Sequence, residues 1–205
     1  MKFLRGCLIF LALDLALLLA LAGAAAYFLT RTPASVRELP PPATSPEKAQ
    51  ALQNRLDEFS RDLEQAGAAG ERKRMSLVIT EEEANSLIAR ELPTFQEKNP
   101  GTLPFRLESA QVSFREGKVL ATAVVDLGGL HPQLAVVARV GAQGGRPEVE
   151  IERIELGRLP LLGLVQNYVQ QGLQAVETED FPLEIDSVQV TDGQVVVEGW
   201  SKPQR

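Results

Sequence analysis

The sequence holds one cysteine, Cys7, and one histidine, His131. A single cysteine cannot form an intramolecular disulfide, and a cysteine-ligated metal site is excluded. A histidine-based metal cage or catalytic triad would have to be built around His131 alone. A general base needs an oriented partner and a nucleophile or water within reach, and the residues near His131 offer neither. We therefore expect an exposed loop histidine.

Basic clusters and nucleotide-binding motifs are also missing. The net charge is -6, and no cluster of Lys and Arg is interleaved with aromatic residues, so nucleic-acid binding is not expected. No P-loop or dinucleotide fingerprint occurs. Ser109, Ser113 and Ser187 lie in expected strands and lack a nucleophile-elbow sequence. We predict no catalytic residue, no cofactor and no metal, and hence no enzyme.

The N-terminus carries the one long apolar run, Cys7–Leu29, which is about long enough to span a bilayer. Residues 1–31 are predicted to be a single-pass anchor. A secretory signal is the alternative, because Ala22–Ala26 resembles a cleavage site. The basic residues before the run favour a cytoplasmic N-terminus and an extracytoplasmic domain, which predicts location in the cell membrane.

Residues 32–46 are rich in proline and are predicted to form an extended stalk, followed by a domain over residues 47–205. Ser45 and Pro46 suit the start of a helix over residues 47–70, whose apolar stripe runs from Leu52 to Ala66. That stripe could pack on its own domain, or it could form a homodimer through residues 52–66.

A sheet-and-helix core is expected over residues 75–201, starting with a strand at Met75–Thr80. Thr80 and Glu83 form a capping-box pattern for the next helix. The carboxylates Glu81 to Glu83 suit a first helical turn, so they are interpreted as structural rather than as a metal site. Pro93 is expected to end that helix.

Three later segments alternate, slip by one residue, and alternate again. The slips follow Leu107, Ile151 and Ile185, and each is followed by an acid: Glu108, Glu152 and Asp186. In a flat strand, each slip would turn half of the apolar side chains into water. A β-bulge absorbs the extra residue and bends the strand. We therefore predict three kinked strands in one curved antiparallel sheet, with the three acids solvated at the bulges.

Leu159–Val176 has one apolar half, one half rich in Gln and Asn, and no charge. It is predicted to be an amphipathic helix that the curved sheet covers. Small residues on the sheet would allow a helix or a ligand to approach closely. The predicted apolar ligand site combines residues of both elements: Leu161, Val165, Tyr168, Val169, Leu173, Ala121, Ala123 and Ala138.

The segment Ile154–Leu161, with Leu164–Tyr168, resembles the YpmS-like bacterial membrane-anchored proteins. More distantly, the chain is similar to LmeA-like and other TULIP-type lipid-binding modules. This resemblance implies a curved sheet wrapped around a long helix at an apolar groove, and it transfers no catalytic residue. The expected fold class is therefore α+β: a curved antiparallel sheet with bulged strands around an amphipathic helix, preceded by one transmembrane helix.

Two functions remain open from the sequence. The first is an anchored extracytoplasmic module that binds a lipid or an acyl chain between the sheet and helix 160–176. The second is a structural or interaction module of the cell envelope with a filled core and no ligand.

Overall fold

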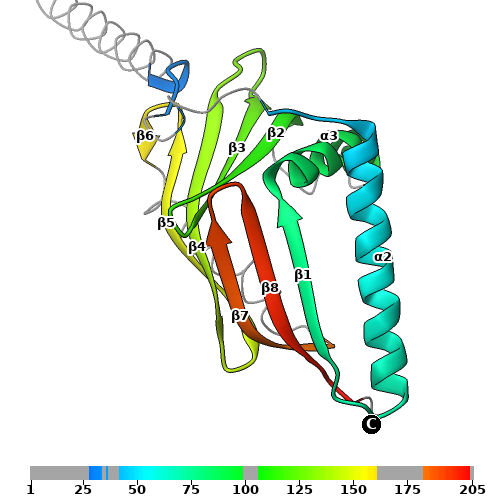
Figure 1. Ribbon diagram of the computed structural model, residues 1–205. Helices are drawn as coiled ribbons and strands as arrows, with labels where there is room; N and C mark the ends of the chain where they lie inside the picture. Colours follow the sequence, from blue (N-terminus) through cyan, green and yellow to red (C-terminus); the bar gives the residue numbers. More distant parts are fainter. Residues whose placement is uncertain (1–27, 34–35, 37–41, 99–105, 161–181, 204–205) are drawn as a thin grey trace, which may run out of the picture.

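The computed structural model describes residues 28–33, 36, 42–98, 106–160 and 182–203. Within these residues the fold is α+β, with two helices and two antiparallel sheets (Figure 1). Sheet A has the strand order β1-β8-β7, and sheet B has the order β2-β3-β4-β5-β6. The elements in chain order are α2 Pro46–Ala68, β1 Arg74–Thr80, α3 Glu81–Lys98, β2 Arg106–Arg115, β3 Lys118–Asp126, β4 Gln133–Gln143, β5 Arg146–Leu156, β6 Leu159–Pro160, β7 Leu183–Thr191 and β8 Gln194–Ser201.

All three predicted bulges are present. The pairing register slips between Leu107 and Ser109, so that Glu108 is the extra residue of β2. In the β4–β5 pair the extra, unpaired residue is Glu152 of β5, and in the β7–β8 pair it is Asp186 of β7. The alternation of apolar residues was therefore sufficient to locate each bulge, because an extra residue is the only way to keep both halves of such a strand on one face.

The three bulge acids are not simply solvated, as the sequence suggested. Each one accepts from a donor on a neighbouring strand or loop. The Nε1 of Trp200 donates to Asp186 at 2.7 Å, and the Nζ of Lys118 donates to Glu152 at 2.7 Å. Nδ1 of His131 lies 2.9 Å from Oε1 of Glu108. The donors stand far away in the sequence, so the register of the sheets brings these pairs together.

The expectation of a single sheet is wrong, because β2 and β1 do not pair and the strands form two separate sheets. Helix α3 lies along the free edge of β2. The side chain of Asn85 donates to the Val112 carbonyl at 2.8 Å and accepts from the Val112 amide at 2.7 Å. Gln96 makes the same pair of bonds with Leu107, at 2.8 and 2.9 Å. These two amides replace a neighbouring strand, so sheet B stops at β2 and β1 pairs with β8 instead.

The bulge in β2 is also what allows α3 to bind at both points. Backbone groups alternate in direction along a strand, so Leu107 and Val112 would normally face opposite edges. The extra residue Glu108 reverses the alternation between them. From Glu81 to Gln96 the helix rises about 22 Å, and from Leu107 to Phe114 the strand rises about 23 Å. The two elements therefore match in length.

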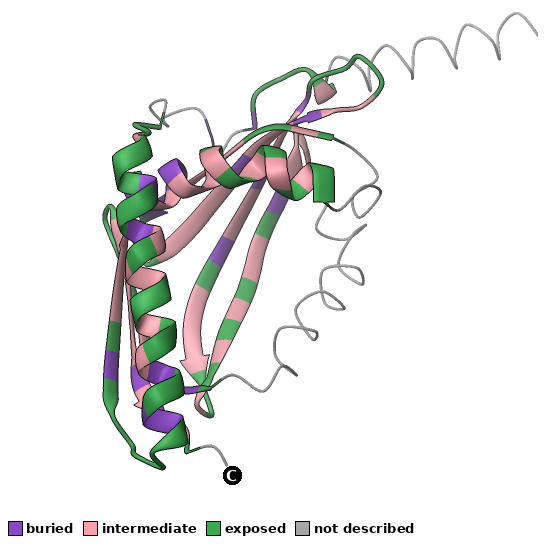
Figure 2. Cartoon of the chain, turned by 90° about the vertical axis from the view of Figure 1, so that its right-hand side faces the viewer, coloured by how far each residue is buried: buried purple, intermediate pink, exposed green. Residues whose placement is uncertain are grey.

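Helix α2 begins as predicted, with Ser45 as N-cap accepting from the Lys48 amide at 3.4 Å. Leu52, Leu63 and Ala66 of its stripe are buried, and buried and exposed residues alternate along the helix (Figure 2). The stripe thus packs on its own domain, which agrees with the first of the two alternatives. The homodimer through residues 52–66 stays untested.

Helix α3 begins with the predicted capping box. The Thr80 amide donates to Glu83 Oε2 at 3.1 Å, and the Glu83 amide donates to Thr80 Oγ1 at 3.3 Å. The predicted end at Pro93 is wrong, since the helix continues to Lys98. Proline removes one backbone bond from a helix. Here Gln96 holds the turn after Pro93, because its side-chain amide donates to the Leu107 carbonyl and accepts from the Leu107 amide.

Two described residues of the predicted stalk are buried, whereas Thr32, Pro42, Ala43 and Thr44 are exposed. The side chain of Pro33 is fully buried, and Val36 is 7% exposed. The Arg158 amide donates to the Phe28 carbonyl at 3.0 Å, which places the segment beginning at Phe28 beside β6 (Figure 1). Burial of these two apolar side chains stabilises their position. The role of residues 32–46 as a stalk stays a prediction.

Glu83 is the residue of α3 with the largest expected effect on stability. It is 8% exposed, caps the helix, and forms a short ion pair with Arg55 of α2. Glu83→Ala is expected to lower the free energy of unfolding by about 2–3 kcal/mol, since a cap and a charged hydrogen bond are lost together. Urea unfolding in detergent, followed by the fluorescence of the sole tryptophan, measures this change.

Glu82→Ala is the matched control, because Glu82 is exposed and contacts only Lys48, at 3.4 Å. We expect a loss below about 0.5 kcal/mol there. Although burial opposes it, hydrogen bonds from the Thr80 backbone and from Arg55 keep the pKa of Glu83 below 4.5. The contribution of this carboxylate should therefore be present at pH values above the ordinary pKa of glutamate and be lost as the pH falls through the lowered pKa of the folded state. A pH-independent gap between wild type and Glu83→Gln would contradict this.

Candidate apolar binding face

One face of sheet B carries apolar side chains only. Strand pairing places Ala121 beside Val112 and Val136, and Ala138 beside Val119 and Ile151. Alternation along each strand then extends this face over all four long strands and β6. We call it the apolar face: Leu107, Ala110, Val112, Phe114, Val119, Ala121, Ala123, Val125, Leu134, Val136, Ala138, Val140, Ala142, Pro147, Val149, Ile151, Ile154, Leu156 and Leu159.

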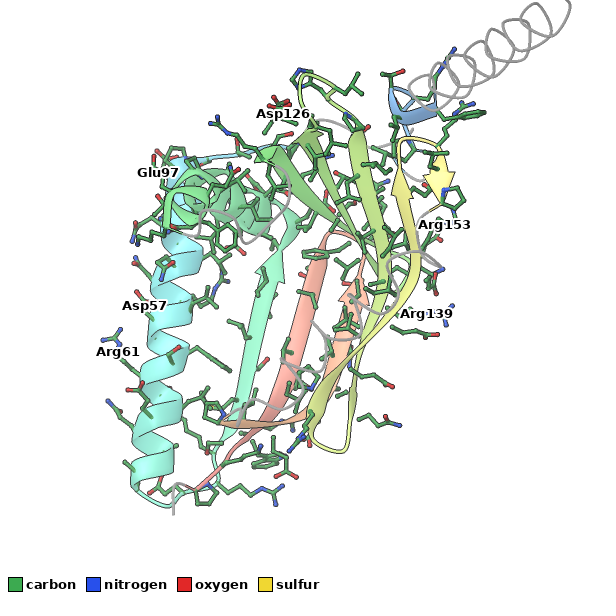
Figure 3. All side chains as sticks on the ribbon, turned by 180° about the vertical axis from the view of Figure 1, so that it is seen from behind. Asp57, Arg61, Glu97, Asp126, Arg139 and Arg153 are labelled. Atoms are coloured by element: carbon green, nitrogen blue, oxygen red, sulfur yellow. The ribbon has the colours of Figure 1, made fainter. Side chains whose placement is uncertain are left out.

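The opposite face of sheet B carries charged side chains, but Leu120, Val124, Ala135 and Val137 also lie on it, and Thr122 and Ala135 are buried there. Glu152 accepts from Lys118 and lies 2.7 Å from Nε of Arg139. The hydrogen bond from Lys118 lowers the pKa of Glu152, and the charge of Arg139 lowers it further. Arg139 and Arg153 project from the β4–β5 side of the molecule (Figure 3). The two faces thus differ in charge: one carries no charged side chain, whereas the other is mixed and carries the charged ones.

Much of the apolar face is only half-buried. Phe114, Val125, Ala138 and Ile154 are between 1% and 8% exposed. The other members, including Ala121, Ala123 and Val136, keep intermediate exposure. In an ordinary core such residues would be covered almost completely. An apolar sheet face that keeps this exposure is suited to a further apolar layer.

The three predicted sheet residues do share one face. Ala121 and Ala123 lie two apart on β3, and Ala138 on β4 pairs with Val119, which puts all three on the apolar face. Gly141, also on β4, lies on the opposite face with Glu148 as its β5 partner. The predicted start of the helix at Leu159 is wrong, because Leu159–Pro160 form strand β6 and pair with β5. The five predicted helix residues, Leu161, Val165, Tyr168, Val169 and Leu173, lie outside the described residues.

Sheet A also has an apolar face, and it meets that of sheet B at one end. Leu183 and Ile185 of β7 pack with Leu63 of α2 and Met75 of β1, and Ala142 of the apolar face packs against this cluster. The Ile185 amide donates to the Gly145 carbonyl, at the tip of the β4–β5 hairpin, at 2.9 Å. The two sheets are therefore joined through apolar side chains.

The carboxylates at the start of α3 all have structural contacts, as the sequence predicts. Glu81 accepts from the Ser113 hydroxyl at 3.0 Å and from the Phe114 amide at 2.9 Å. Glu82 pairs with Lys48, and Glu83 caps the helix. A polar pocket of about 510 Å³ opens beside them, toward the β7–β8 turn. Over the described residues, no group of three or more His, Cys, Asp or Glu side chains is arranged to hold a metal ion.

His131 is exposed in its loop, as expected, but the sequence missed its partner. Glu108 is the extra residue of a bulge on β2, whereas His131 follows β3. Both side chains are about half exposed, at 54% for His131 and 40% for Glu108. Asn85 and Gln96 were also missed as edge partners of β2. Glu81, Asn85 and Gln96 are spaced so that they lie on one face of the helix. This polar stripe is the sequence pattern that could have identified Asn85 and Gln96 as partners of β2.

Comparison with protein families, with characterised proteins and with solved structures finds no match to this chain. The resemblance to YpmS-like proteins therefore stays a prediction. In the part of the chain that the structure describes, no helix has the length and hydropathy to span a membrane. All but the last two residues of the predicted span, Phe28 and Leu29, lie outside that part.

Proposed function

We propose that this protein is a membrane-anchored extracytoplasmic module that binds a lipid or another apolar ligand on the apolar face of sheet B. It is proposed to act by binding rather than by catalysis. The observation that carries the proposal is a face without a single charge that stays half-buried across its centre. The apolar run before Leu29 would attach it to the cell membrane.

The free energy available for such binding is considerable. Apolar surface removed from water contributes about 25 cal/mol per Å², or roughly 0.8 kcal/mol per methylene group. A long acyl chain against the face would therefore gain several kcal/mol. The centre of the face has short side chains, at Ala121, Ala123 and Ala138. An acyl chain can therefore lie close to the backbone of the sheet there. The uncharged half of the predicted helix 160–176 supplies a second apolar surface from the sequence.

Native mass spectrometry of the full chain extracted from cells tests this proposal. We expect a co-purified lipid with the wild type. Ala123→Glu places a charge on the apolar face and should remove most of that lipid, whereas Val124→Glu, the next residue on the opposite face, should retain it. Because Ala123→Glu can also impair folding, Ala121→Leu provides an uncharged variant that fills the same area.

Retention of lipid by both apolar-face variants, or its absence from repeated wild-type preparations, would contradict the proposal. Circular dichroism of each variant shows whether the fold is kept.

One observation favours the alternative of an interaction module with a filled core. Among the described strands, β1 pairs only with β8, so its other edge is open for pairing. A groove of about 280 Å³ runs along that edge, between Phe59 and Asp62 of α2 and Met75 and Leu77 of β1. A wild type without lipid that recovers a protein partner, lost on Ser76→Pro, would support this alternative.

A further inference from the structure

Three large apolar side chains are strongly exposed among the described residues: Phe28, Phe95 and Leu130, at 43%, 46% and 39%. Two of them, Phe28 and Leu130, lie at the same end of sheet B. The Phe28 carbonyl accepts from Arg158, and the neighbouring Gly157 donates to Gln133 at 2.8 Å. Gln133 begins β4, directly after the loop that carries Leu130. Figure 1 shows both segments at the upper end of the molecule.

The segment at Phe28 contacts the β5–β6 turn directly, at the end of sheet B. Gly157 has a positive φ of 59°, and a Cβ there would overlap the carbonyl oxygens of Phe28 and Leu29. This close approach, together with the hydrogen bond from Arg158, holds the segment against the β5–β6 turn. Because the long apolar run ends at Leu29, a bilayer that held this run would lie directly at the end of sheet B.

The loop that carries Leu130 is held in a defined shape. The Gly129 amide donates to the Asp126 carboxylate at 2.9 Å, and the Leu127 amide donates to the Leu130 carbonyl at 2.8 Å. A loop of this kind cannot readily turn its leucine inward. A single exposed leucine is common on protein surfaces, so Leu130 gains its meaning from lying at the same end of sheet B as Phe28 and the end of the apolar run.

We propose that this end of sheet B lies at the surface of the lipid bilayer, with Phe28 and Leu130 at the boundary between headgroups and acyl chains. The inference rests on the proposed anchor. Arg106 and Arg158 are exposed at the same end and would face lipid headgroups. Anionic lipids attract each such side chain with about 1 kcal/mol.

This arrangement deepens the proposed function, because the apolar face extends to the same end. Leu134 pairs with Leu156, and Leu156 pairs with Leu159 of β6, directly beside the Gly157 turn. A lipid that leaves the bilayer at this point meets apolar side chains without crossing water. The ligand class that fits is therefore a membrane lipid rather than a soluble apolar compound.

Fluorescence quenching of the full chain in lipid nanodiscs tests the position. Cys7→Ser removes the sole native cysteine, so that one added cysteine carries the only label. The test position is Leu130→Cys. Arg61→Cys is the first control, an exposed position on α2 that Figure 3 shows well away from the end of sheet B where Asp126 lies. Gln143→Cys marks the β4–β5 hairpin at the opposite end of sheet B.

We expect quenchers attached to lipid chains to quench the label at residue 130 several-fold more strongly than the labels at residues 61 and 143. Aqueous iodide should show the reverse order. Equal quenching at the three positions, or stronger lipid quenching at residue 143, would overturn the proposed position. Flotation of the same nanodiscs reports on the anchor separately, and lipid co-purification reports on the apolar face, so failure of each proposal is distinguishable.

Discussion

Leu183→Ala is expected to lower the free energy of unfolding by about 3–5 kcal/mol, at the upper end of the range for a buried leucine. Leu183 is 1% exposed and packs with Leu63, Met75 and Ile185, where α2 and the two sheets meet. Truncation would leave a cavity that three different elements surround, and none of them can move inward without losing its own contacts. Urea unfolding in detergent measures the change.

Leu77→Ala is the matched control for this substitution. Leu77 lies on the same face of sheet A, since it pairs with Val197, but it is only half-buried. A smaller loss of about 1–2 kcal/mol is expected, because part of the side chain is already in water. Equal losses at the two positions would mean that Leu183 is not the centre of this packing.

Gly199→Ala is the second substitution with a large expected effect. Gly199 lies in the middle strand of sheet A, and a Cβ there would overlap the carbonyl oxygen of Glu184 and lie 3.0 Å from the Cα of Ile185. Both obstacles are backbone atoms beside the bulge at Asp186, so β7 itself would have to move. We expect a loss of about 3 kcal/mol, measured as a lower urea midpoint with an unchanged slope.

Gly141→Ala separates this steric effect from a general effect of glycine. Gly141 also lies within a strand, and its added Cβ would meet only the end of the Glu148 side chain, at 3.9 Å. Alanine should therefore be neutral there, or stabilise by up to about 1 kcal/mol through reduced freedom of the unfolded chain. Destabilisation at Gly141 comparable to that at Gly199 would refute the steric explanation.

Local patterns were reliable wherever the physical cause was local. The bulges at Glu108, Glu152 and Asp186 follow from apolar alternation alone, because a slipped pattern has only one way to stay on one face. The capping box at Thr80 involves neighbours three residues apart. For the same reason, the shared face of Ala121, Ala123 and Ala138 could be predicted from strand alternation and hairpin order.

Predictions failed where a distant residue provided the decisive contact. Pro93 normally ends a helix, but the bonds of Gln96 to Leu107 hold the following turn. The partner, Leu107, cannot be identified from the residues around the proline.

By itself, the sequence determined most of the described strands, their three bulges, the N-caps of both helices and the shared face of Ala121, Ala123 and Ala138. Only the tertiary structure decided how many sheets these strands form, because the edge of β2 is occupied by Asn85 and Gln96 of α3. It also decided the partners of the bulge acids and the place where Phe28 meets the domain. The physical reason is range: alternation and capping act between neighbours in the chain, whereas edge closure and packing depend on residues that only folding brings together.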